Sequence, residues 1–170
     1  SSPSENIFDQ VKLETANFSG RMDNLRSSIL IPQLEELDKK VTQWNKLYNV
    51  LNDNLKKQNG IFFPNRDSDE YFVGSSIQFR IDSLNNGQIK SFINNCKARG
   101  VDLKWFGDEK PVAYTSRYDS WKYLDNIPRL ANTLRILAKT FDMRIPLTFT
   151  IQDCNIISEI IIEELQKVQN

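Results

Sequence analysis

The amino-acid sequence predicts an α+β fold, in which a small mixed or antiparallel sheet carries helices on one face and a long amphipathic helix lies alongside. The main observation is the order of periodic segments, which runs helix, strand, helix, strand, helix, strand, helix. In addition, 170 residues with 39% apolar content are enough to bury one core. We therefore expect an irregular lead-in over residues 1–20 and one domain over residues 21–170.

The first helical pattern is the longest. It begins near Met22, and Pro32 is expected to interrupt or restart it because proline lacks an N–H group and favours the first helical turn. Apolar spacings of three and four then predict a long helix over residues 33–58, which stops at Asn59-Gly60. Its apolar seam consists of Leu34, Leu37, Val41, Trp44, Tyr48, Leu51 and Leu55. Such a seam needs a partner surface, either the sheet or another chain.

Three strands are predicted from aromatic and β-branched content and from alternation. They cover residues 71–81, 101–105 and 143–149. In the second of these, Val101, Leu103 and Trp105 are expected to face the core, and Lys104 is expected to face solvent.

Three further helices complete the pattern. One covers residues 87–99 and ends at Gly100, one is opened by Pro128, and the last begins at a capping box of Thr150 and Asp153. The inward positions predicted for them are Ile89, Phe92, Ile93, Cys96, Leu130, Leu134, Leu137, Ile156, Ile157, Ile160, Ile161 and Leu165.

Composition argues against several functions. Because 22 Lys and Arg balance 22 Asp and Glu, no net field attracts nucleic acid or an anionic membrane. No apolar run approaches the roughly 18 residues needed to span a bilayer. The absence of histidine removes Ser-His and Cys-His nucleophile pairs and all His-containing metal sites. Cys96 and Cys154 fit as small buried hydrophobes in a cytoplasmic protein. We expect no nucleic-acid, membrane or metal binding.

Short motifs along the chain carry a family resemblance. They are Gly20-Arg21-Met22-Asp23-Asn24-Leu25, Trp44-Asn45, Ala98-Arg99-Gly100-Val101 and Met143-Arg144-Ile145-Pro146-Leu147. In this order they resemble the carboxy-terminal region of DegT/DnrJ-like aminotransferases, from Asn17 onward. The resemblance implies the small C-terminal domain of a fold-type-I enzyme that binds pyridoxal phosphate on a lysine of its large domain.

The resemblance also implies partners and a division of labour. The family lysine lies upstream of the Arg-Met pair, so this chain, which starts Ser1-Ser2-Pro3 without Met, is expected to be a piece with no catalytic residue and no cofactor of its own. In the full-length protein we expect pyridoxal phosphate, an N-terminal cofactor-binding domain, a homodimer and a small-molecule keto or keto-sugar acceptor.

Two residues are candidates for cofactor binding. Family members use an Asn shortly before Arg-Met to reach the neighbouring subunit's cofactor phosphate, which suggests Asn17 and Arg21, although Ser19 and Gly20 depart from the usual spacing. A second departure is Trp105-Phe106-Gly107, where sugar aminotransferases of this group usually have a His in the following loop. The nucleotide-sugar substrate therefore stays open.

Four residues are candidates for substrate binding. Tyr114, Arg117 and Trp121 lie in a loop dense in aromatic and hydrogen-bonding groups, and Arg80 ends a strand. A guanidinium can hold a substrate carboxylate with two hydrogen bonds. The alternatives are that Arg117 pairs with Asp119, that Trp121 fills the core and that Arg80 forms a surface salt bridge. The alternative function is a non-enzymatic assembly module that uses the seam from Leu34 to Leu55.

Overall fold

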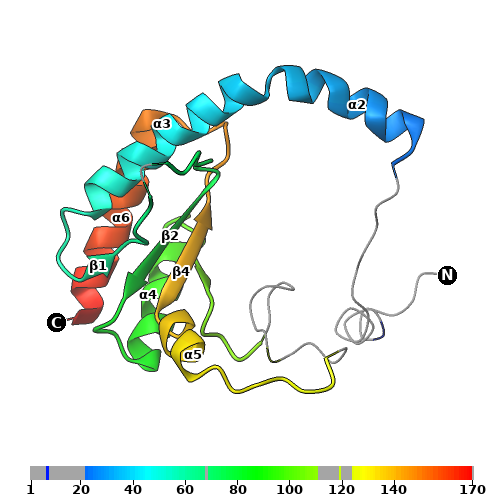
Figure 1. Cartoon of the computed structure of the whole chain (residues 1–170). Helices are drawn as coiled ribbons and strands as arrows, with labels where there is room; N and C mark the ends of the chain where they lie inside the picture. The colour runs from blue at the N-terminus through cyan, green and yellow to red at the C-terminus, as the bar shows by residue number, and fades with distance from the viewer. Residues whose placement is uncertain (1–6, 8–21, 68, 111–118, 120–123, 170) are drawn as a thin grey trace.

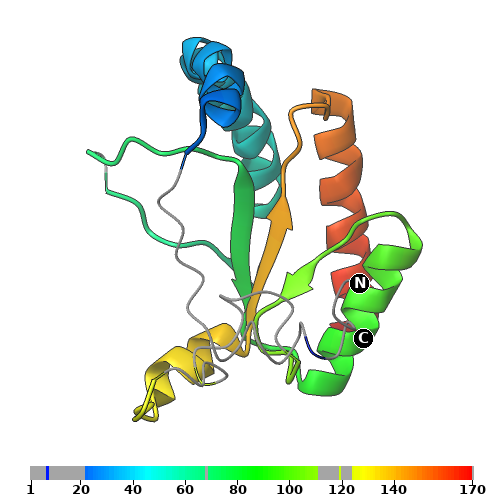
Figure 2. The same cartoon turned by 90° about the vertical axis from the view of Figure 1, so that its right-hand side faces the viewer.

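The computed structural model describes residues 7, 22–67, 69–110, 119 and 124–169, and it confirms the α+β class. Its elements are α2 (Asn24–Glu35), α3 (Leu37–Leu55), β1 (Ile61–Phe62), β2 (Ser76–Ile81), α4 (Asn86–Ala98), β3 (Lys104–Trp105), α5 (Ala131–Leu137), β4 (Thr140–Arg144) and α6 (Ile151–Gln169). The strands form one sheet in the order β1-β2-β4-β3, and every neighbouring pair is antiparallel. Helices α3, α4 and α6 cover one face of this sheet (Figures 1 and 2).

The core lies between the sheet and these three helices. Alternation along β2 and β4 directs Ile77, Phe79, Phe141 and Met143 inward, where all four are buried. The Phe141 ring stacks on Phe79 with centroids 5.5 Å apart, and Phe92 of α4 meets Phe141 edge-on at 5.5 Å. These aromatic contacts join the two central strands to the helical layer.

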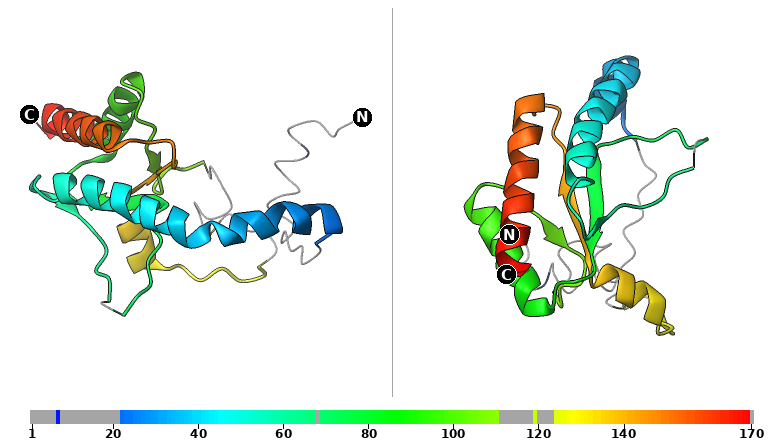
Figure 3. Two further views of the ribbon diagram at one scale, coloured as in Figure 1. Left: turned by 90° about the horizontal axis from the view of Figure 1, so that it is seen from above. Right: turned by 90° about the vertical axis from the view of Figure 1, so that its left-hand side faces the viewer.

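The long helix differs from the prediction at its break. Helix α2 continues through Pro32, and the chain leaves helical geometry at Glu36, with φ −92° and ψ 1°. Proline holds φ at a helical value, so it costs one backbone hydrogen bond without forcing a break at that residue. Helices α2 and α3 therefore follow one another along an arc that reaches beyond the sheet (Figure 3).

The predicted seam is covered only from Val41 onward. Val41, Tyr48, Leu51 and Leu55 are buried against the domain, and the half-buried Trp44 indole donates a hydrogen bond to the Ile145 carbonyl at 2.9 Å. In contrast, Leu34 is 64% exposed and Leu37 is 43% exposed. Helix α2 contributes no buried residue. The first half of the seam is thus exposed, because it extends past the sheet.

The predicted strand over residues 71–81 is too long at its start. The Asn45 side chain of α3 donates to the Phe72 carbonyl at 2.9 Å and accepts from the Gly74 N–H at 2.7 Å. These backbone groups are satisfied by a side chain instead of a strand ladder, so β2 begins only at Ser76.

The other two strands are displaced or shortened. Strand β4 lies at Thr140–Arg144, not at 143–149, because its register with β2 places Thr140 opposite Arg80. Pro146 then offers no N–H for further pairing. Strand β3 contains only Lys104–Trp105, although Val101, Leu103 and Trp105 are all buried as predicted.

Helix ends follow local signals closely. Asn85 and Gln88 form a capping box at the start of α4, and Gly100 has φ +87° just after its end. At α6 the Asp153 N–H donates to the Thr150 hydroxyl at 3.1 Å, and the Thr150 N–H donates to the Asp153 carboxylate at 2.8 Å. The hydrogen bond from the Thr150 N–H lowers the pKa of the Asp153 carboxyl, and a second hydrogen bond from the Thr150 hydroxyl lowers it further.

Some predicted inward positions are wrong. Helix α5 starts at Ala131, three residues after Pro128, and buries none of its residues; Leu130 is 41% exposed. The helix spans only seven residues and lies at the end of the sheet, so the other described elements do not enclose it (Figure 1). In α6, Ile156 is 44% exposed, whereas Ile160, Ile161 and Leu165 are buried as predicted.

Both cysteines are buried, as predicted. Burial, reinforced by the negative charge of Glu164, raises the pKa of the Cys96 thiol to about 12. Burial also raises the pKa of Cys154. Because the thiolate is the nucleophilic form, these shifts disfavour nucleophilic chemistry at either cysteine. Among the described helices, none is long and apolar enough to cross a membrane.

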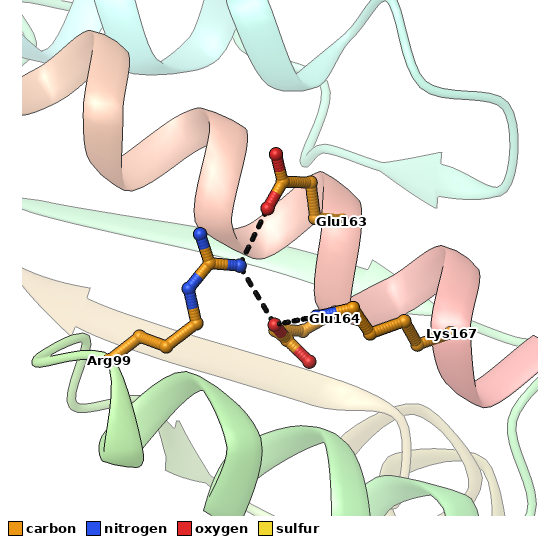
Figure 4. A network of polar contacts seen from close by, with 4 residues as sticks. All are labelled: Arg99, Glu163, Glu164 and Lys167. Carbon is orange, nitrogen blue, oxygen red and sulfur yellow. Dashed lines mark hydrogen bonds and ion pairs between the residues drawn. The ribbon is translucent and has the colours of Figure 1, made fainter.

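An ion network joins α4 to α6 (Figure 4). Arg99 at the end of α4 donates to Glu163 at 2.6 Å and to Glu164 at 2.8 Å, and Lys167 donates to the same Glu164 oxygen at 2.7 Å. The Glu164 side chain is only 3% exposed. The hydrogen bonds from Lys167 and then Arg99 hold the pKa of the Glu164 carboxyl below its usual range.

We expect Glu164→Gln to destabilise the protein at neutral pH and much less in acid. A lowered folded-state pKa contributes stability above the unfolded pKa of about 4.3, and this contribution is lost as pH falls through the folded value. The measurement is the free energy of unfolding in urea at several pH values between about 3 and 7. The control is Glu159→Gln, an exposed position on the same helix. If the loss in free energy of unfolding is the same at every pH, the effect comes from packing and not from the charge of Glu164.

Candidate functional site on the polar face of the sheet

Five of the six predicted site residues lie outside the described residues. They are Asn17, Arg21, Tyr114, Arg117 and Trp121. Their roles stay predictions. The sixth, Arg80, lies near the end of β2 on the sheet face opposite the helical layer.

Strand register organises this second face into rows of side chains. Phe62 of β1, Arg80 of β2 and Thr140 of β4 are paired across the sheet, and all three alternate with core residues. The next row contains Gln78, Asp142 and Lys104, and the last contains Ser76 and Arg144. The face is therefore mostly polar, with Arg80, Lys104 and Arg144 contributed by three different strands and Asp142 in the middle row.

Arg80 forms a salt bridge with Asp82, which is the alternative to a substrate contact that the sequence left open. Its Nε atom lies 2.8 Å from Asp82 Oδ1, and its side chain is 37% exposed. The contact is Coulombic, because the buried Nε–H makes no hydrogen bond of acceptable geometry. The guanidinium carbon also lies 5.5 Å from the centroid of the Phe62 ring. The N–H groups of the two terminal nitrogens are not used by this salt bridge, so Arg80 can still bind an anion.

Arg80 also lines a hollow of about 330 Å³ between β1, the end of β2 and α5. Its walls are largely apolar. A larger hollow, about 740 Å³, lies beyond the short strand β3 and is bordered by Lys97, Lys104, Asp142 and Arg144. Charges of both signs border this second hollow, and the Lys104 ammonium lies 4.8 Å from the Phe106 ring centroid. The structure thus places a small, largely apolar hollow beside β1 and α5, and a larger hollow with charges of both signs at the β3 edge of the sheet.

Most residues of this face had no predicted role. Thr140 and Asp142 received no role because the last strand was predicted to start three residues too late. Gln78 and Arg144 lay inside predicted strands but were given no role in binding. The period-two alternation of residues 140–144 was the available signal.

The lysines of the described residues bear on pyridoxal phosphate binding, because a Schiff base to this cofactor forms on a lysine. None of these lysines is buried, and the half-buried Lys139 donates its ammonium to the Leu84 carbonyl. The predicted phosphate contacts, Asn17 and Arg21, lie outside the described part. Within that part, no group of three or more His, Cys, Asp or Glu side chains is arranged to hold a metal ion.

These features define an α+β domain whose helices cover one sheet face and whose opposite face is polar and hollowed. The chain belongs to the DegT/DnrJ/EryC1/StrS aminotransferase family, whose family model matches residues 3–161. Aminotransferases of this family normally use pyridoxal phosphate.

Among solved structures, the chain is similar to a DegT DnrJ EryC1 StrS aminotransferase from Brucella abortus. The TM-score is 0.58 at 14% sequence identity, which supports the fold. The match covers 83% of this chain but only 35% of that one. The chain therefore spans about a third of the length of that structure. The comparison with curated proteins finds no significant match.

Proposed function

We propose that this chain forms the C-terminal small domain of a pyridoxal-phosphate-dependent aminotransferase. The observation that carries the proposal is the family match over residues 3–161, in a chain that spans 35% of an aminotransferase of similar fold. The cofactor-binding lysine would belong to an N-terminal large domain of the same protein. The complete enzyme would be a cytoplasmic homodimer that transfers an amino group to a keto or keto-sugar acceptor.

The residues of this chain bind and position the cofactor phosphate and the substrate, and the bound cofactor supplies the electron sink for amino transfer. Asn17 and Arg21 hold the cofactor phosphate of the neighbouring subunit. Arg117 holds an anionic group of the substrate, and Tyr114 and Trp121 form the pocket wall around it. Arg80 offers a second guanidinium on the polar sheet face.

The isolated chain is expected neither to bind pyridoxal phosphate covalently nor to transaminate, because a Schiff base needs an activated lysine. The measurement is the absorbance of the chain mixed with pyridoxal phosphate, followed by borohydride reduction and peptide mapping. The matched control is the same chain extended by its N-terminal domain. Stoichiometric attachment of pyridoxal phosphate to one lysine of the 170-residue chain would contradict the proposal that the cofactor lysine lies in the N-terminal domain.

Arg117→Ala in the full-length enzyme is expected to lower kcat/KM by on the order of tenfold or more, because charge-assisted hydrogen bonds to substrate are lost. The melting temperature should stay unchanged. Arg129→Ala, at an exposed position, is the control. If Arg117 is instead a structural partner of Asp119, the variant will melt earlier and retain its kinetic constants.

A second candidate function is an assembly module. Helix α2 and the start of α3 expose Leu25, Ile29, Leu34 and Leu37, with Leu25 72% exposed. A second copy of this chain, packed along the same stripe, would remove these side chains from water. Sedimentation equilibrium tests this function: the chain should dimerise, and Leu34→Glu should return it to a monomer. A chain that stays monomeric at high concentration excludes it.

A further inference from the structure

The hollow beside Arg80, named here the Arg80 pocket, has the dimensions and chemistry of a small-molecule site. Its volume of about 330 Å³ falls in the range of known ligand pockets, roughly 300–1,000 Å³. Its apolar walls come from Phe62, Phe63 and Pro64 on one side and from Ile136 and Leu137 of α5 on the other. Binding pockets typically combine such walls with a few convergent polar groups.

The polar groups of the Arg80 pocket favour an anion. Among the described residues that line it, Arg80 is the one with a formal charge, and Gln78 and Thr140 are the others that carry polar side chains. Asp82 engages only the Nε edge of the guanidinium, at 2.8 Å. The buried Nε–H makes no hydrogen bond of acceptable geometry, and the terminal nitrogens carry further N–H donors. A carboxylate or phosphate fits such donors in bidentate geometry.

The walls favour an apolar body on the same ligand. Phe62 is 48% exposed and Ile136 is 43% exposed, although both border the pocket. A small inorganic anion would leave these side chains in water. An aromatic or aliphatic group would cover them, and the Phe62 ring already lies near the guanidinium.

We propose that the Arg80 pocket binds a small organic anion, whose carboxylate or phosphate lies on Arg80 and whose aromatic or aliphatic body lies between Phe62 and Ile136. This inference extends the predicted role of Arg80 from an anion contact to a pocket with a defined class of ligand. It does not rest on the aminotransferase proposal, since binding requires neither cofactor nor a second domain.

The test is a titration of the ¹⁵N-labelled chain with 3-phenylpropanoate, followed by NMR. The amide resonances of Phe62, Arg80, Ile136 and Thr140 should shift and saturate in the millimolar range. Two probes separate the two halves of the ligand. 3-Phenylpropanamide keeps the ring without the charge, and inorganic phosphate keeps a charge without the ring; each should bind at least about tenfold more weakly.

Variants locate the site. Arg80→Gln should weaken binding of 3-phenylpropanoate by on the order of tenfold or more, and Ile136→Ser, which trims an exposed wall, should weaken it severalfold. The matched control is Arg144→Gln, an exposed cation of the same sheet face that lies outside the pocket. It should leave the affinity unchanged.

Three results would overturn the proposal. One is the absence of saturable shifts at these amides. Another is equal affinity for the acid and the amide, which would remove the role of charge. The last is equal weakening by Arg80→Gln and Arg144→Gln, which would show general attraction to the face instead of a site.

Discussion

Phe141→Ala is expected to lower the free energy of unfolding by about 3–5 kcal/mol, since truncating a buried phenylalanine removes apolar burial and leaves a cavity. Phe141 is fully buried on the central strand β4 and contacts the rings of Phe79 and Phe92. The loss would therefore affect both the sheet and its attachment to α4. Urea denaturation monitored by circular dichroism measures the effect.

The control for this experiment is Phe62→Ala on edge strand β1. Phe62 is 48% exposed, so its truncation should cost about 1 kcal/mol or less. The comparison separates burial from residue type. Equal losses at the two positions would mean that the core does not lie on the face to which Phe141 points.

Gly74→Ala is expected to destabilise the protein by about 1–3 kcal/mol, the usual cost of overpacking. A Cβ atom at this position would lie 2.5 Å from Tyr48 Cβ and 2.9 Å from Tyr48 Cγ. Neither atom is the far end of a flexible side chain, so the loop must move away from α3. That movement would also break the hydrogen bond from the Gly74 N–H to Asn45, now 2.7 Å.

Gly87→Ala provides the matched control for Gly74→Ala. Its new Cβ atom would meet only the Asn85 Oδ1 atom, at 3.3 Å, in the first turn of α4. There the lower conformational entropy of the unfolded chain offsets the small shift that this contact requires of Asn85, so the change should be close to neutral. Thermal and urea unfolding of both variants test the difference. A Gly74→Ala variant as stable as Gly87→Ala would show that the loop does not pack against Tyr48.

Local signals in the sequence determined the end of α4 and the start of α6, as well as the inward positions of the central elements. The Thr150 and Asp153 capping box and the positive φ of Gly100 follow from interactions within a few residues. The alternation of Val101, Leu103 and Trp105 predicted that they share one side, which the structure buries. A side chain that caps its own helix needs no information from the rest of the fold. For the same reason, the α+β class followed from the order of these local patterns.

Strand limits and the candidate site were decided by contacts that are distant in sequence. Asn45 of α3 binds the backbone of Phe72 and Gly74, so strand β2 starts later than the sequence predicted. The register of β2 with β4 sets where the last strand begins. This register and the pairing of β1 with β2 together form the Arg80 pocket, because they bring residues of α5 and of β1 to Arg80. Periodicity gives the direction of a side chain but not its neighbours, so only the tertiary structure could show what Arg80 contacts.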